Sequence, residues 1–187
     1  PYARIAELLT MFCLPAAVLI ITIDIGRPER FLFNVMRYGR VQAPFVWSAT
    51  VISTYLFASL VYLYLSMRRD FALCADLVPK WRRFYKLLAL GYQDTEEERR
   101  RHEKTLWWMS IALIPIMVSV HSVYGFVYGL HSSRAGWFNP YMAPYFVLGA
   151  INNGFATLVI VAALIRKVFG WEEYLSLRGL RNLARFL

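Results

Sequence analysis

Long apolar runs, separated by shorter charged stretches, dominate the sequence. Four runs, at 5–25, 45–67, 106–130 and 141–165, each have the length of about 20 residues that an α-helix needs to cross the hydrocarbon core of a bilayer. None is a secretory signal, because the first lacks a basic start and a small-residue cleavage site. The pattern predicts an all-α integral membrane protein, a single membrane domain over 1–187 with four transmembrane helices.

Composition supports this prediction. The 187 residues are 58% hydrophobic, whereas a soluble domain is about 45–50% apolar and has too little interior to bury so much apolar surface. A net charge of +9 would suggest nucleic acid for a soluble protein, but the basic loops of a membrane protein account for it, so we expect no nucleic-acid partner. Cys13 and Cys74 lie far apart without metal-ligand spacing, which predicts neither a disulfide nor a cluster.

Positive charge is divided unequally between the two ends of the predicted helices. One side carries 16 Lys and Arg residues, counting Arg4, ten in the 68–105 loop and five in the C-terminal tail, whereas the other side carries five. Because basic loops stay in the cytoplasm, we expect the 68–105 loop and the tail to be cytoplasmic. The protein would lie in the inner (plasma) membrane, with the loop after its first helix facing outward.

Two segments on the basic side, at about 80–91 and 171–187, have amphipathic patterns. In the first, four apolar residues at helical spacing alternate with four basic ones, which is typical of a helix on an anionic membrane surface. The apolar residues are Trp81, Phe84, Tyr85 and Leu88, and the basic ones are Lys80, Arg82, Arg83 and Lys86. The sequence TEEE at 95–98 has capping-box spacing and predicts a helix that starts there and continues into the third membrane run.

An ionisable residue, His121, lies near the middle of the third run, with Tyr124 on the same helix face. Ionisable residues inside membranes mark functional sites by default, and imidazole titrates near physiological pH, which favours a proton-transfer role. The alternative is a packing histidine that bonds a neighbouring helix. A pair of haem ligands is excluded, because His131 lies roughly 15 Å further along the helix and His102 lies in the inner loop.

Charged residues gather where the first apolar run ends, in the stretch IDIGRPER at 23–30. Gly26 and Pro28 predict a turn there. Asp24 precedes the turn and should point back toward the helix end, where Arg27 can neutralise it. A carboxylate at the membrane rim could then accept a proton or a hydrogen bond from a polar ligand head. The alternative is a set of helix-end charges that reach water and pair with one another.

Two motifs inside the predicted helices point to helix packing. Gly125 and Gly129 form a GxxxG step, which lets two helices approach closely. Asn152 and Asn153 lie near the middle of the last run, between glycines. They are expected to bond a neighbouring helix or, alternatively, to line a polar path.

Four stretches of the sequence together resemble a known family. They are DIGRPERF at 24–31, RYGRVQAPFVW at 37–47, SVHSVYG at 119–125 and RAGWFNPYMAPYFVLGAINNG at 134–154. In order and spacing they resemble the NrfD-like, polysulfide-reductase-type membrane subunits, with relatives in alternative complex III and in sulfate-reducer respiratory complexes. The resemblance implies a bundle of eight or more helices, so we expect further helices before Pro1 and after Leu187.

The resemblance also implies a function. Members of the family bind a quinone, for which menaquinone is expected here, near the outer face, and they have no haem or metal of their own. A ferredoxin-like iron–sulfur subunit docks on that face and exchanges electrons with the quinone, and other membrane subunits join the complex. The quinone-binding residues implied by the matching motifs are Asp24, Arg27, Arg30, His121 and Tyr124, with Asp24 and His121 as the catalytic groups.

Two positions depart from the relatives in alternative complex III. Ser48 and Val127 stand where those proteins have aspartates of a proposed proton path, which weakens the expectation of proton pumping of that kind. The sequence therefore predicts a quinone-binding membrane subunit of a respiratory oxidoreductase complex. The alternative is a structural membrane anchor without a quinone site. A transporter is disfavoured, because no inverted repeat or pair of broken helices is visible.

Overall fold

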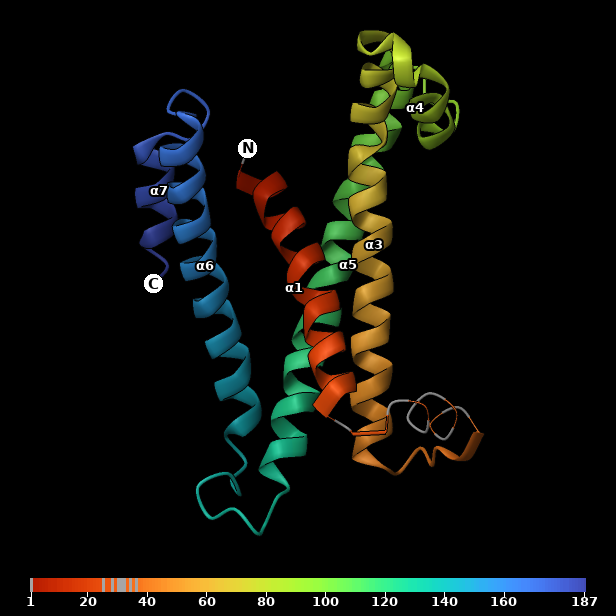
Figure 1. Ribbon diagram of the computed structural model, residues 1–187. Helices are drawn as coiled ribbons and strands as arrows, with labels where there is room; N and C mark the ends of the chain where they lie inside the picture. Colours follow the sequence, from red (N-terminus) through yellow and green to blue (C-terminus); the bar gives the residue numbers. More distant parts are fainter. Residues whose placement is uncertain (1, 25, 28, 30–32, 34, 36) are drawn as a thin grey trace.

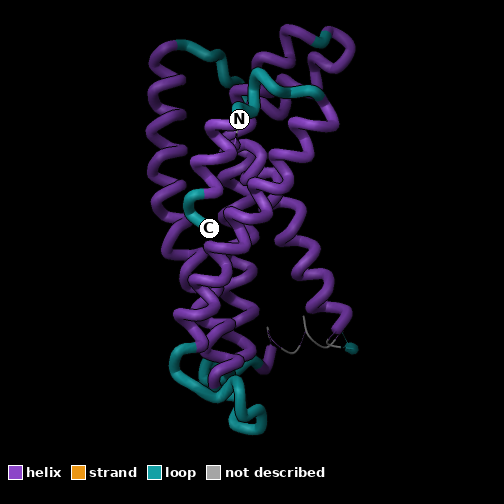
Figure 2. The backbone as a smooth tube through the Cα atoms, turned by 90° about the vertical axis from the view of Figure 1, so that its left-hand side faces the viewer, coloured by secondary structure: helices purple, strands orange, loops and turns teal. Residues whose placement is uncertain are grey.

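The computed structural model is built from helices, most of which run along one axis (Figure 1). It describes all residues except 1, 25, 28, 30–32, 34 and 36, and only the backbone of Asp24. The long helices are α1 (Tyr2–Asp24), α3 (Pro44–Leu77), α5 (Glu96–Gly129) and α6 (Met142–Phe169). The short ones are η1 (Pro79–Trp81), α4 (Arg82–Ala89) and α7 (Leu177–Ala184). Loops gather at the two ends of the bundle (Figure 2).

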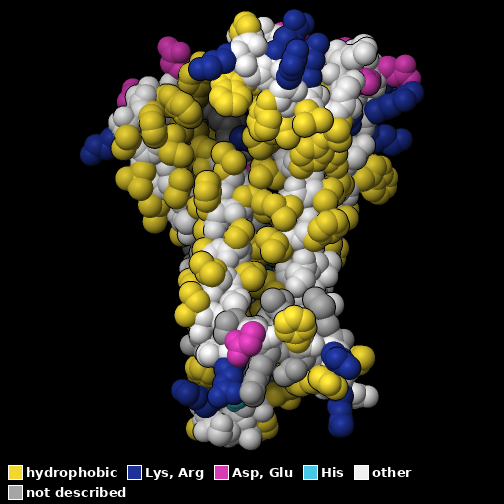
Figure 3. Space-filling view, turned by 45° about the vertical axis from the view of Figure 1, so that its right-hand side comes forward, with side chains coloured by type: hydrophobic (Ala, Val, Ile, Leu, Met, Phe, Trp, Pro, Cys, Tyr) yellow, Lys and Arg dark blue, Asp and Glu magenta, His cyan; other side chains and the backbone are white. Residues whose placement is uncertain are grey.

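The four long helices are each long and apolar enough to cross a membrane, which confirms the predicted fold class. Many of their large apolar side chains point outward, and Phe12 and Phe57 are 76% and 71% exposed. In the space-filling view, Lys and Arg gather at the two ends, and apolar side chains cover the middle (Figure 3). Lipid favours this arrangement, because helices satisfy their own backbone groups and present apolar side chains to the hydrocarbon.

Helices α3 and α5 extend beyond the predicted membrane runs. Each has 34 residues, which is about 51 Å of helix against a hydrocarbon core of about 30 Å. The start of α5 is capped, because the Thr95 hydroxyl accepts a hydrogen bond from the N–H of Glu98, and the Glu98 carboxylate accepts one from the N–H of Gln93 at 2.7 Å. The helix start predicted at Thr95 is confirmed.

Helix α5 packs against both α3 and α6, and α1 packs against α3 and α6. The close approach of α5 to α6 depends on glycine. A Cβ atom at Gly125 would lie 2.6 Å from the Cα of Ala143, and one at Gly129 would lie 3.0 Å from the carbonyl oxygen of Asn139. The GxxxG step therefore serves helix packing, as predicted.

Small polar residues occupy the inner face of α3. Ser48, Ser59 and Ser66 are buried, and their separations of about three and two helical turns place them on one face. Small residues on a membrane helix allow the neighbouring backbone to approach, and their hydroxyl groups can bond across helices. Ser66 does so, as described below.

Helix α7 runs back along α6 (Figure 1). The ring of Phe186 stacks on that of Phe155, with centroids 5.1 Å apart. The Tyr2 hydroxyl donates a hydrogen bond to the carbonyl of Ser176 at 2.8 Å, and a Cβ atom at Gly179 would lie 2.5 Å from the Tyr2 ring. The start of α1 is thereby joined to the segment that leads into α7. That the 171–187 segment lies at a membrane interface stays a prediction.

Candidate functional site

The outward site predicted from the sequence begins where α1 ends. Gly26 has a φ of +74°, and its N–H donates to the carbonyl of Ile23 at 3.2 Å. Helices commonly end on a glycine in this left-handed conformation, so the predicted turn is confirmed at Gly26. Arg27 is exposed. The side chain of Asp24 and the whole of Arg30 lie outside the described residues, so their contact with a quinone stays a prediction.

His121 lies in α5, about 12 Å from the end of that helix at Gly129. Its Nδ1 atom is 2.9 Å from the carbonyl oxygen of Met117. A carbonyl can only accept a hydrogen bond, so Nδ1 carries the hydrogen and Nε2 is the acceptor nitrogen of the neutral ring. Within the described part of the chain, no group bonds Nε2. His121 therefore combines a fixed ring with an open basic nitrogen, which a proton-transfer group needs.

Tyr124 and Tyr128 continue the same face of α5. The Tyr128 ring stacks on Phe146 of α6 at 5.4 Å and meets the edge of Trp137 at 5.2 Å, so it belongs to the packing between α5 and α6. Tyr124 is half-buried one turn deeper. The structure thus places His121 and Tyr124 on one face of α5. Among the described residues, neither makes a hydrogen bond with Arg27.

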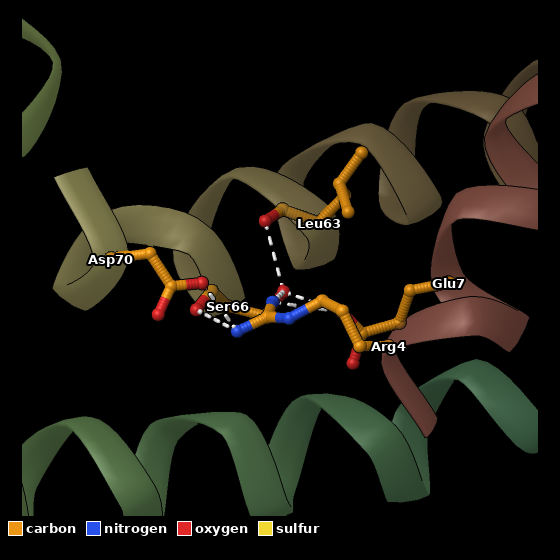
Figure 4. Close-up of polar contacts among 5 residues, drawn as sticks. All are labelled: Arg4, Glu7, Leu63, Ser66 and Asp70. Atoms are coloured by element: carbon orange, nitrogen blue, oxygen red, sulfur yellow. Dashed lines mark hydrogen bonds and ion pairs between the residues drawn. The ribbon is translucent and has the colours of Figure 1, made fainter. Parts of the chain in front are cut away.

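Sequence reasoning missed a polar cluster at the other end of the bundle, between α1 and α3 (Figure 4). Arg4 donates to the carboxylates of Glu7 and Asp70 at 3.1 and 2.7 Å and to the Ser66 hydroxyl at 2.6 Å. The Ser66 hydroxyl in turn donates to Glu7 at 2.7 Å. Because one guanidinium faces two carboxylates, the cluster as a whole is negative.

The cluster left only a weak signal in the sequence. Arg4 and Glu7 are three residues apart, which is the spacing of a pair on one helix face. Asp70 is distant in the chain and reaches Arg4 only because α3 runs antiparallel to α1. The side chain of Glu7 is 16% exposed, so this acid is held inside the protein rather than in water.

A cavity of about 290 Å³ adjoins the cluster, between α1, α3 and α5. Its walls are mainly apolar, with Glu7, Tyr55 and Tyr62 among the polar groups. It reaches Met117, whose carbonyl fixes the ring of His121. The cavity therefore extends from the polar cluster to within about one helical turn of His121.

No group of three His, Cys, Asp or Glu side chains that could hold a metal ion occurs within the described residues. Cys13 and Cys74 are both free.

Comparison with known proteins decides the family. The family model described as "Polysulphide reductase, NrfD" matches residues 1–181. The chain belongs to this NrfD family. The resemblance recognised in four sequence motifs is thereby confirmed, and with it the membrane character of the protein.

Two curated proteins illustrate the relationship within the NrfD family. A putative membrane subunit of dimethyl sulfoxide reductase from Halobacterium salinarum is 29% identical over 163 residues, which cover 87% of this chain and 35% of that protein. A subunit of selenate reductase from Mesobacillus selenatarsenatis is 27% identical over 165 residues, which cover 84% of this chain and 38% of that protein. The chain thus spans little more than a third of the length of these relatives.

Proposed function

We propose that this chain is the quinone-binding part of a membrane subunit that passes electrons from a quinol to a respiratory reductase complex. The observation that carries the proposal is the NrfD family match over residues 1–181. The names of the two relatives, a dimethyl sulfoxide reductase membrane subunit and a selenate reductase subunit, support this direction of electron flow. A reductase must be supplied with electrons, and menaquinol is a donor that dissolves in the membrane.

Oxidation of a quinol to a quinone releases two electrons and two protons. The electrons pass to a ferredoxin-like iron–sulfur subunit docked on the outer face. The protons leave the two hydroxyl groups, and the groups proposed to accept them are the Asp24 carboxylate and the Nε2 atom of His121. Because the bond from Nδ1 to Met117 already fixes the ring, Nε2 can take a proton without reorientation. Arg27 and Arg30 follow Asp24 closely and lower the cost of keeping it charged.

Substitution of His121 tests this role. In the purified full-length complex, His121→Phe should lower quinol oxidation by about a hundredfold, the lower end of the contribution of a general base. His131→Phe is the matched control. The Nδ1 atom of His131 also lies near the carbonyl oxygen four residues earlier, that of Val127, at 2.7 Å, but His131 is exposed just beyond the end of α5. Parental turnover in an assembled His121→Phe complex would remove His121 from the mechanism.

The second candidate function is a structural anchor that holds its partners on the membrane without binding a quinone. The observation that favours it concerns Ser48, which stands where the relatives in alternative complex III have an acid. The Ser48 hydroxyl donates a hydrogen bond within its own helix, to the carbonyl of Pro44 at 3.3 Å. Extraction of quinone from the purified complex separates the two functions. Quinone in a stoichiometric amount supports a binding site, and its absence supports the anchor.

A further inference from the structure

Helix α4 is attached to α3 by hydrogen bonds at its C-terminal end. The Tyr64 hydroxyl donates to the carbonyl of Leu88 at 2.8 Å, and the Arg68 guanidinium donates to the next two carbonyls at 2.9 and 3.1 Å. The last carbonyls of a helix have no partner within the helix. These contacts supply partners and hold the end of α4 in place.

The loop after α4 strengthens the attachment. The Tyr92 ring lies under the Arg68 guanidinium at 5.5 Å, and the Tyr92 hydroxyl donates to Asp94 at 3.2 Å. Asp94 pairs with Arg69 of α3 at 3.0 Å. Burial, and after it the neighbouring Asp94 carboxylate, raise the pKa of Tyr92 above its ordinary value. The Tyr92 hydroxyl therefore keeps its hydrogen and remains a donor at neutral pH.

The contact with Arg68 determines the depth of α4. Arg68 is the first charged residue of α3, which begins at Pro44, so about 36 Å of uncharged helix precedes it. The hydrocarbon core is about 30 Å thick. Helix α4 therefore lies where α3 leaves the hydrocarbon and enters the headgroup layer, beside the adjoining ends of α3 and α5 (Figure 1).

One face of α4 packs on α3. Ala89 is buried, and Tyr85 and Leu88 are half-buried. The Tyr85 ring stacks on Phe71 of α3, with centroids 6.5 Å apart. Tyr85 and Leu88 belong to the apolar pattern that predicts contact with the membrane surface, but the structure places them against protein.

The other face of α4, together with η1 before it, combines large apolar side chains with basic ones. Trp81, Phe84 and Leu87 are 55%, 53% and 69% exposed. Four exposed cations surround them, and within the described residues none of the four is in an ion pair. These cations are Lys80, Arg82, Arg83 and Lys86. No acidic residue occurs at 77–93, so this segment contains no carboxylate of its own to neutralise the positive charge.

We propose that this face of α4 binds the headgroups of anionic phospholipids, of which phosphatidylglycerol is the simplest. The cations would pair with lipid phosphates, while Trp81, Phe84 and Leu87 enter the boundary between headgroups and acyl chains. Phosphatidylcholine carries its own cation beside the phosphate and fits the face less well. An acidic protein could match the charge, but the depth of α4 favours lipid, because it places the apolar side chains where acyl chains begin.

The test uses the delipidated full-length protein in its complex. Phosphatidylglycerol or phosphatidylcholine is added in detergent, and native mass spectrometry gives the apparent Kd of the tightest-bound lipid. The variant replaces Lys80, Arg82, Arg83 and Lys86 by Gln. Since each cation near an anionic membrane surface contributes about a fivefold factor in binding, we expect the Kd for phosphatidylglycerol to rise at least about tenfold. The Kd for phosphatidylcholine should change little.

A second variant serves as a control for total charge. Replacement of Arg99, Arg100, Arg101 and Lys104 by Gln removes the same charge from the start of α5, where Glu96 and Glu97 pair with two of these cations. Its Kd for phosphatidylglycerol should stay near that of the parent. An equal loss in both variants would overturn the proposal, because bulk charge would then explain the binding. So would an α4 variant that keeps the parental Kd but loses a partner protein from the complex, since the face would then bind protein.

Discussion

Replacing Gly125 by alanine should push α5 away from α6. The added Cβ atom would lie 2.6 Å from the Cα of Ala143 and 2.8 Å from the carbonyl oxygen of Met142. Carbon atoms in contact normally lie about 3.5–4.0 Å apart, so the two helices must separate by about 1 Å. Both neighbouring atoms belong to the backbone of α6 and cannot turn aside as a flexible side chain would.

The cost follows from two opposing terms. Overpacking typically lowers the free energy of unfolding by about 1–3 kcal/mol, whereas alanine in a helix gains about 1 kcal/mol over glycine. Because the backbone cannot relax locally, we expect a cost near the top of that range and a net loss of about 1–2 kcal/mol. Gly149→Ala is the matched control. No atom lies within 4 Å of its Cβ position, so it should stabilise α6 by up to about 1 kcal/mol.

Unfolding of the purified full-length protein in mixed micelles, titrated with sodium dodecyl sulfate and followed by circular dichroism, measures both changes. The two variants should differ by about 2–3 kcal/mol in the free energy of unfolding. If Gly125→Ala is as stable as Gly149→Ala, then α5 and α6 do not pack through this glycine, and the assigned role of the GxxxG step is wrong.

Three further outcomes follow from the structure and the proposed function. In the same titration, Glu7→Gln should lower the free energy of unfolding by about 1–2 kcal/mol. The control Glu97→Gln, whose ion pair is exposed, should lower it by less than about 0.5 kcal/mol. A loss for Glu7→Gln that is as small as the loss for Glu97→Gln would show that the Arg4 cluster is dispensable. Asp24→Asn should slow quinol oxidation much more than it weakens quinone binding, with partial recovery at high pH, and parental turnover at every pH would leave Asp24 as a helix-end charge. A cysteine at position 97 should react in intact cells with a permeant thiol reagent but not with an impermeant one. Labelling by the impermeant reagent would reverse the predicted orientation, in which the 68–105 loop is cytoplasmic.

The sequence predicts the membrane part of each helix because long uncharged runs have few alternatives in a bilayer. It does not predict how far a helix continues into water. Helix α3 extends to Leu77 through the charged residues at 68–70, and the reason lies in packing: Phe71 meets Tyr85 of α4, and Ala75 is buried. Such contacts depend on how the chain folds back, which a hydropathy pattern does not contain.

The candidate site was predictable only in part. An intramembrane histidine is visible in the sequence, and its chemical role follows from residue type, whereas the open Nε2 atom follows from the bond that Met117 makes to Nδ1. The Arg4 cluster depends on the register between α1 and α3, which brings Asp70 to a residue 66 positions earlier. A single sequence carries no information on that register, so Arg4 contributed to the sequence-based prediction only as a topological charge.

The bond between Tyr2 and the Ser176 carbonyl has a consequence for biogenesis. It joins residues that are 174 positions apart. At a synthesis rate of about 5–20 residues per second, Ser176 emerges roughly ten to thirty-five seconds after Tyr2. During that interval the N-terminal end of α1 lacks this hydrogen bond and is available to other membrane factors. Tyr2 therefore completes this contact only after α6, which precedes Ser176 in the chain, has been synthesised.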